Sequence, residues 1–161
     1  MRQPYVIERI QVKGLAFYVL KKTGVDSFIE KMANSPKKRN DLRLILKQLE
    51  RIEKAGLDWA FSSETLKPLK SSGSPPVHEL RCMPQTNRVM TYLHRKGEET
   101  ILVLLFDFEG HKASKSMGGI NNETLAKGHR LAEIAKELLE QGKGVSDGRS
   151  ELDAGRSQRN G

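Results

Sequence analysis

The chain has 161 residues and one cysteine, Cys82, so its length suits a single domain and a disulfide framework is excluded. Its 28 lysines and arginines exceed its 20 acidic residues and give a net charge of +8, which fits a nucleic-acid partner without indicating one. The first residues lack the apolar stretch of a secretory signal, and the longest apolar run, residues 101–106, is too short to span a bilayer, so we expect a cytoplasmic protein without a membrane partner.

The beginning of the chain predicts one strand. Residues 1–14 mix apolar and charged side chains. A short strand through Tyr5, Ile7 and Val12 is one interpretation, but the alternation is imperfect, and we treat this stretch as an N-terminal extension. Residues 15–20 (LAFYVL) are rich in strand-forming side chains, and the Lys-Lys-Thr-Gly that follows is a typical stop. We therefore expect the first strand of the domain at residues 15–20.

Two helices are expected next. Residues 26–33 place apolar side chains at helical spacing, with Asp26 as the expected N-cap. A second helix is expected over residues 36–55, with Ser35 as its N-cap and Gly56 at its end. Each helix has one apolar stripe, so the two predict a hairpin that packs through a single face.

Three strand-like runs follow an expected irregular region at residues 57–76. They cover residues 77–83, 87–94 and 100–108, and the short turns between them predict an antiparallel meander. The last run contains an unbroken apolar segment, residues 101–106, so we expect it to be the central strand, covered on both faces.

A final helix is expected at residues 122–141. The polar tail after it, residues 142–161, has too little apolar surface to offset its ordering entropy, and we expect it to be disordered. The order strand, helix hairpin, meander and helix predicts an α+β domain over residues 15–141. We expect its helices on one face of a mostly antiparallel sheet of about four strands, namely the first strand and the three strands of the meander.

Three segments of this region carry a family resemblance: Glu64–Lys70 (ETLKPLK), Val77–Arg81 (VHELR) and Asn87–Tyr92 (NRVMTY). Their order and spacing resemble the RelE/HigB family of toxins, in particular its phage-associated branch, in which the helix hairpin precedes the sheet. That family typically has a leucine–lysine–x–leucine element, then a glutamate–leucine–arginine strand and an arginine–valine strand. A hydrophobic strand ending in phenylalanine, lysines and a helix follow, so the resemblance covers residues 15–141.

The resemblance implies a RelE-like fold and the toxin of a type II toxin–antitoxin system. Such a toxin is an endoribonuclease that cleaves messenger RNA, commonly on the ribosome, and is neutralised by an antitoxin protein. The resemblance implies neither a metal nor an organic cofactor. In metal-independent cleavage the ribose 2′-OH attacks the adjacent phosphate, which requires a proton acceptor, cations that stabilise the phosphorane, and a proton donor for the leaving oxygen.

Two arginines match the arginines of the family's strand motifs. Arg81 belongs to the glutamate–leucine–arginine strand and Arg88 to the arginine–valine strand, and both are candidate catalytic residues. A guanidinium binds phosphate through two parallel hydrogen bonds and stays charged, so the pair can stabilise the transition state if both side chains share a face. The alternatives are that each arginine forms an ion pair with Glu79 or Asp107, or that it is a solvated charge at the edge of the sheet.

Four lysines are candidates for holding the RNA. Lys112 and Lys115 follow the central strand, where the family keeps basic residues, and we assign Lys112 to catalysis and Lys115 to RNA binding. Lys67 and Lys70 extend the same basic surface as RNA-binding residues. The alternative for each lysine is an ordinary solvated position.

The proton carriers are less well defined by the sequence. His94 shares a strand face with Arg88 and His111 follows the central strand, so both are candidates. Many family members have a tyrosine or histidine near the start of the final helix, but residues 116–120 contain neither. Either His111 or Tyr92 substitutes, or the ribosome contributes, or the chain does not cut RNA. The last case leaves two alternatives, a non-catalytic RNA- or DNA-binding module and a protein-interaction domain.

Overall fold

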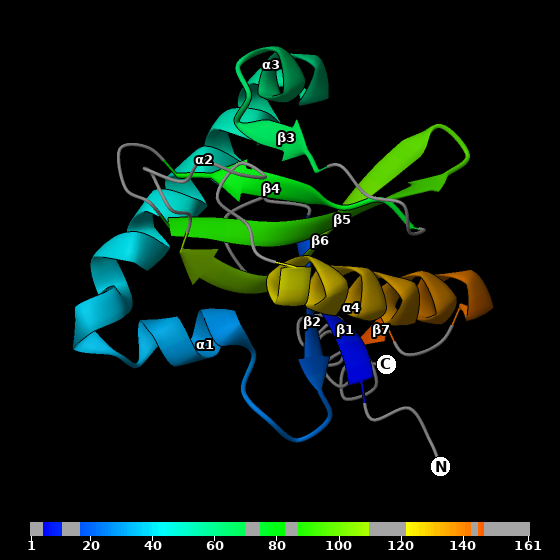
Figure 1. The fold of residues 1–161 in the computed structure, drawn as a ribbon, viewed down its shortest axis with the longest axis horizontal. Coiled ribbons are helices and arrows are strands. Elements are labelled where there is room, and N and C mark those ends of the chain that lie inside the picture. The colour runs from blue at the N-terminus through cyan, green and yellow to red at the C-terminus, as the bar shows by residue number, and fades with distance from the viewer. Residues whose placement is uncertain are drawn as a thin grey trace, which may run out of the picture.

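A computed structural model describes residues 5–10, 17–69, 75–82, 87–109, 122–142 and 145–146, and the structural statements below refer to these residues (Figure 1).

One twisted sheet organises the described part of the chain. Its strands are β1 (Tyr5–Arg9), β2 (Phe17–Lys22), β3 (Leu66–Pro68), β4 (His78–Arg81), β5 (Asn87–Lys96), β6 (Glu99–Glu109) and the two-residue β7 (Val145–Ser146). They are ordered β3-β4-β5-β6-β2-β1-β7. Neighbouring strands are antiparallel, except that β2 runs parallel to β6 and β7 parallel to β1. The predicted α+β class, the mostly antiparallel sheet and the central position of β6 are therefore confirmed.

The predicted size of the sheet was wrong. The described residues form six strands and the short β7, whereas about four were expected, namely the first strand and the three strands of the meander. β1 comes from the stretch treated as an N-terminal extension, and β3 from a region predicted to be irregular. The sequence left β1 only as a possible short strand, because its central residue, Ile7, is the one fully buried residue of the strand, which therefore shows little hydrophobic alternation.

The helices are α1 (Phe28–Ala33), α2 (Arg39–Ala55), α3 (Leu57–Ser62) and α4 (Asn122–Gln141), with a 3₁₀ turn, η1 (Pro36–Lys38), before α2. Gly56 ends α2 with φ 96°, as predicted, whereas α3 lies in the region expected to be irregular. The N-cap of α1 is Ser27 rather than Asp26. The Ser27 hydroxyl accepts a hydrogen bond from the Glu30 amide at 3.1 Å, and the Ser27 amide donates to the Glu30 carboxylate at 2.8 Å.

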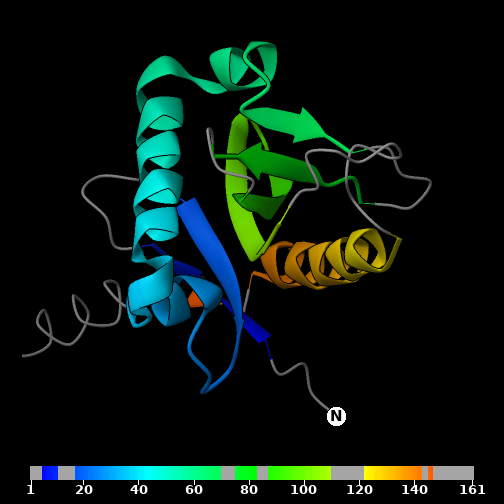
Figure 2. The same ribbon diagram turned by 60° about the vertical axis from the view of Figure 1, so that its left-hand side comes forward.

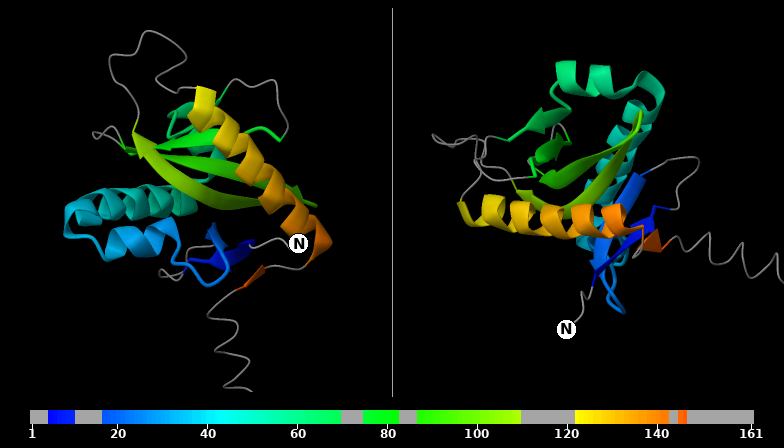
Figure 3. Two further views of the ribbon diagram at one scale, coloured as in Figure 1. Left: turned by 60° about the horizontal axis from the view of Figure 1, so that its bottom comes forward. Right: turned by 90° about the vertical axis from the view of Figure 1, so that its right-hand side faces the viewer.

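Helices cover both faces of the sheet, which corrects the prediction that they lie on one (Figures 2 and 3). α1, α2 and α3 pack on one face, called here the α2 face, and α4 crosses the other, called the α4 face. β2 shows why both faces need cover, because Val19 packs on the α2 face and Leu20 on the α4 face. The main contributors to the α2 face are Met32, Ile45, Leu49, Ile52, Leu80 and Val89. Those to the α4 face are Ile7, Met90, Tyr92, Val103, Leu131 and Ala135.

The first half of α4 lies close against β5 and β6. A Cβ added at Gly128 would lie 2.8 Å from the sulfur of Met90, so glycine allows the helix backbone to approach the strand. The Lys127 ammonium lies 4.3 Å from the centre of the Phe106 ring. These contacts place α4 over the strand region that adjoins Arg88, two residues before Met90 on β5. Within the described helices, none is long and apolar enough to cross a membrane.

Candidate functional site

Arg81 and Arg88 lie directly opposite each other on neighbouring strands. Arg81 is the last residue of β4, Arg88 is the second of β5, and the two are cross-strand partners. The next pair along the ladder, Leu80 and Val89, packs on the α2 face. Because side chains alternate along a strand, both arginines project from the α4 face, with Cα atoms about 5 Å apart as in any antiparallel pair.

A buried carboxylate lies between the two guanidinium groups. Glu79 Oε1 is 3.5 Å from Arg88 Nε, and Glu79 Oε2 is 3.9 Å from Arg81 Nε. The Glu79 side chain is only 6% exposed, against 12% for Arg88 and 25% for Arg81. The ion pair with Glu79 that was an alternative role for these arginines is thus present. Asp107 instead accepts a hydrogen bond from the Lys38 ammonium at 3.4 Å.

Two further charged residues complete the group. Lys67 on β3 is the cross-strand partner of Glu79 and so projects from the same face. Glu64, which precedes β3, accepts a hydrogen bond from Arg81 Nη1 at 3.2 Å, and its side chain is 61% exposed. Glu64 has a left-handed backbone conformation, φ 62°, which turns the chain between α3 and β3. Glu64, Lys67, Glu79, Arg81 and Arg88 are called the arginine cluster below.

Burial and charge act on Glu79 in opposite directions. Desolvation raises the pKa of its carboxyl group, while Arg88, Arg81 and Lys67 oppose that rise by stabilising the carboxylate. Within the described residues, Oε1 of Glu79 has no hydrogen-bond partner. The Glu79 carboxylate is therefore stabilised by electrostatic attraction to the nearby cations and not by a full set of hydrogen bonds. The Glu79 carboxylate therefore interacts strongly with any charged ligand that approaches the two arginines, because burial reduces the screening of its charge.

The cluster suits an anion more than a metal ion. Three cations and two carboxylates leave it with a small positive formal charge, and both guanidinium groups retain some exposure. Guanidinium groups form short, charge-assisted hydrogen bonds with phosphate oxygens. No group of three His, Cys, Asp or Glu side chains in the described ranges is arranged to hold a metal ion.

His94 lies away from the cluster. It projects from the α4 face as predicted, beside Tyr92, and its Nδ1 is 3.0 Å from the Tyr92 hydroxyl. The stretch of β5 from Arg88 to His94 spans roughly 20 Å at the usual rise per residue. Burial lowers the pKa of His94 and raises that of Tyr92 to about 12. The structure therefore does not bring His94 or Tyr92 to the arginines.

The remaining described histidines and Cys82 are also outside the cluster. His78 is on the α2 face, where its ring lies 5.6 Å from that of Phe61, and burial lowers its pKa. His129 Nδ1, on α4, lies 2.9 Å from the carbonyl oxygen of Pro75. Cys82 is fully buried, and desolvation raises the pKa of its thiol to about 12. The predicted site residues His111, Lys112, Lys115 and Lys70 lie outside the described residues.

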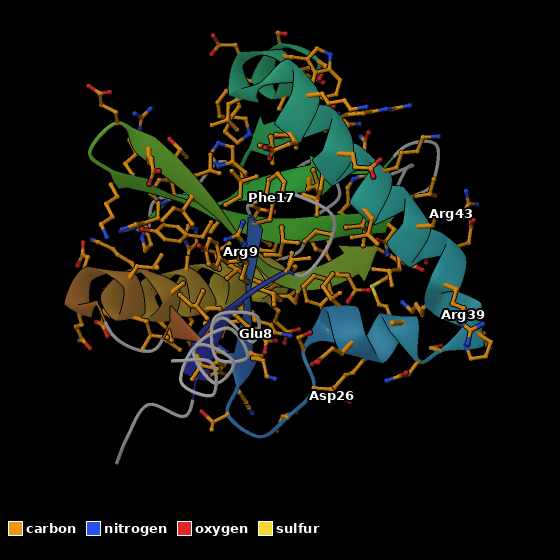
Figure 4. The ribbon with its side chains drawn as sticks, turned by 180° about the vertical axis from the view of Figure 1, so that it is seen from behind. Glu8, Arg9, Phe17, Asp26, Arg39 and Arg43 are labelled. Carbon is orange, nitrogen blue, oxygen red and sulfur yellow. The ribbon has the colours of Figure 1, made fainter. Side chains whose placement is uncertain are left out.

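Exposed basic residues also line α2. Arg39 and Arg43 lie on the outer side of this helix, away from the strands (Figure 4). Lys47 and Arg51 continue the exposed series at four-residue spacing. The helix also contains three acidic residues, Asp41, Glu50 and Glu53, so its surface carries both signs of charge.

The sequence indicated the two arginines but not the central position of Glu79. Its place could have been found by alternation, because Glu79 and Arg81 are two residues apart on one strand and must share a face. Alternation does not predict that Glu79 is buried, because its burial depends on the neighbouring strands. No protein-family model, curated protein or solved structure matches the chain.

Proposed function

We propose that this chain is a toxin-type endoribonuclease of the RelE/HigB kind, which cleaves messenger RNA and is neutralised by an antitoxin protein. The observation that carries the proposal is the direct cross-strand pairing of Arg81 and Arg88 on one face of the sheet. The two arginines come from two of the three segments that carry the family resemblance. Two phosphate-binding groups in register, in a chain with a net charge of +8, favour an RNA substrate.

In the proposed reaction the two guanidinium groups bind the phosphate that is to be cleaved. The 2′-OH of the preceding ribose attacks phosphorus, and the bond from phosphorus to the 5′-oxygen breaks. The products are a 2′,3′-cyclic phosphate and a new 5′-hydroxyl end. Arg81 and Arg88 stabilise the additional negative charge of the phosphorane, and Lys67 contacts the RNA backbone nearby. His111 remains a candidate for proton transfer, with the ribosome as an alternative source, and Lys112 remains a candidate for stabilising charge in the transition state. His94 is not included because of its distance from Arg88.

A non-catalytic RNA-binding module is the second candidate. It is favoured by one observation: His94, a predicted proton carrier, lies at the far end of β5 from Arg88, where it pairs with Tyr92. The two functions differ in their products. Cleavage generates new 5′-hydroxyl ends on cellular transcripts, whereas binding alone protects or retards RNA without generating ends.

The first test is inducible expression in bacteria with mapping of transcript ends. Wild-type protein should arrest growth and generate 5′-hydroxyl ends. Arg88→Lys keeps the charge but removes the two-pronged contact, and it should lower the rate of cleavage about 10²- to 10³-fold. Arg95→Ala is the matched control, because Arg95 is exposed at the other end of the same strand and its removal should leave both effects intact.

The truncation Arg88→Ala requires a folding control. It leaves the buried Glu79 with only one close guanidinium, and breaking a buried pair typically costs about 3–5 kcal/mol. The double variant Arg88→Ala/Glu79→Gln removes the negative charge together with its partner, and should restore much of the melting temperature. If this folded double variant still cut RNA at the wild-type rate, the assignment of Arg88 to catalysis would be wrong.

The proposed antitoxin should cover the arginine cluster. Carboxylates of the partner are expected to approach Arg81 and Arg88, because these two groups and Lys67 are the cations of the arginine cluster.

A further inference from the structure

Glu79 contributes a fixed negative charge to a site proposed to bind a negative substrate. It is the least exposed member of the arginine cluster, and both of its carboxylate oxygens face guanidinium groups. Its carboxylate oxygens lie near the Nε atoms of the two arginines, on the side of each guanidinium group next to the side-chain stem. Without Glu79 the described cluster would have three cations and only the exposed Glu64 against them.

We propose that Glu79 sets the charge selectivity of the arginine cluster, so that it favours a phosphodiester over a phosphomonoester. The proposal rests on the proposed function and deepens it, because it names the kind of phosphate that the site accepts. A phosphodiester within an RNA chain carries one negative charge. A phosphomonoester, as in a nucleotide or at a phosphorylated RNA end, carries close to two at neutral pH.

The physical reason is the place of the carboxylate. The formal charge of the cluster, three cations less two carboxylates, equals the charge that one phosphodiester neutralises. For a second negative charge on the ligand, repulsion from Glu79 offsets most of the attraction from the cations. Because Glu79 is buried, this repulsion is weakly screened by water and salt. The site thereby discriminates against free nucleotides, which would otherwise compete with RNA.

The test compares two small ligands in direct binding measurements on the full chain. One is uridine 5′-monophosphate, and the other is the 2′-O-methyl dinucleoside monophosphate of uridine, which cannot be cleaved by 2′-OH attack. The measured quantity is the ratio of the two dissociation constants. Comparing this ratio between variants cancels the contribution of the extra base and sugar.

Glu79→Gln keeps the shape of the side chain and removes its charge. It should strengthen binding of the monophosphate more than that of the dinucleotide, and shift the ratio about five- to tenfold toward the monophosphate. Glu64→Gln makes the same change of formal charge next to the same Arg81, but at an exposed position. It should shift the ratio less than about twofold, because water screens Glu64.

Arg81→Gln provides a second variant in case Glu79→Gln does not fold. It lowers the positive charge by one unit, so both ligands should bind more weakly and the ratio should move toward the dinucleotide. An equal change for both ligands in the two variants would mean that Glu79 has a structural role only, and would overturn the inference. If neither ligand bound the wild-type chain, or if Arg88→Lys left both affinities unchanged, the proposed function itself would fail at this site.

Discussion

Tyr92 and His94 form a buried polar pair at the far end of β5 from the arginine cluster. Their side chains are joined at 3.0 Å, and each is less than one-tenth exposed. The pair satisfies two polar groups that would otherwise be stranded in an apolar layer beneath α4. Because protonation of His94 would place a charge in this layer, the pair should affect how the free energy of unfolding depends on pH.

The stability of the chain should decrease as the pH falls below about 6.5. Burial lowers the pKa of both His78 and His94 in the folded chain, so the unfolded chain binds protons more readily. The contribution of these two histidines to the free energy of unfolding is therefore fully present above the ordinary histidine pKa of 6.5, and is lost progressively as the pH falls toward the lowered values. His94→Gln should make this decrease shallower in urea denaturation at about pH 7, 6 and 5. A slope equal to that of the wild type would show that His94 is exposed to water.

At the scale of single elements, α1 is stabilised by its N-terminal cap. Ser27 is buried, and it exchanges two hydrogen bonds with Glu30 in a reciprocal cap. Ser35 occupies the corresponding position before η1, but its side chain makes no cap hydrogen bond. The two serines therefore form a matched pair for measuring the value of the cap.

Ser27→Ala should lower the free energy of unfolding by about 1 kcal/mol, because it leaves a helix amide without an acceptor. Ser35→Ala should change it by less than about 0.5 kcal/mol. Chemical denaturation of the two variants beside the wild type provides the comparison. Equal effects of the two substitutions would contradict the reciprocal cap at Ser27.

At the scale of the whole molecule, the N-terminal strand is part of the core. β1 pairs with β2 in an antiparallel ladder, and Ile7 is opposite Leu20. Ile7 is fully buried among the residues that α4 covers, which lie far away in the sequence. The α4 face is therefore completed by a segment that precedes the first predicted strand.

Ile7→Ala should cost about 2–5 kcal/mol of unfolding free energy, as expected when a buried aliphatic side chain is truncated. Val25→Ala is the control, because Val25 is 42% exposed and its truncation should cost less than about 0.5 kcal/mol. The melting temperatures of the two variants would be compared with that of the wild type. A loss no larger for Ile7→Ala than for Val25→Ala would exclude β1 from the folded core.

The sequence by itself determined the elements whose signals are local. The apolar stripes of α2 and α4, the stop at Gly56, the three strands of the meander and the central place of β6 follow from periodicity, caps and turns within a few residues. The sequence also placed Arg81 and Arg88 on neighbouring strands of the meander, but their register as direct cross-strand partners came from the structure.

Only the tertiary structure decided what depends on residues distant in the chain. It placed helices on both faces, recruited β1 and β3 to the sheet, and separated His94 from Arg88 by the length of a strand. It also buried Glu79 between two arginines. The burial of a side chain depends on which strand or helix packs over it, and the local sequence pattern does not indicate which distant element that is. The charged residues of the cluster were therefore visible in the sequence, whereas the burial of Glu79 between the two arginines was decided by tertiary packing.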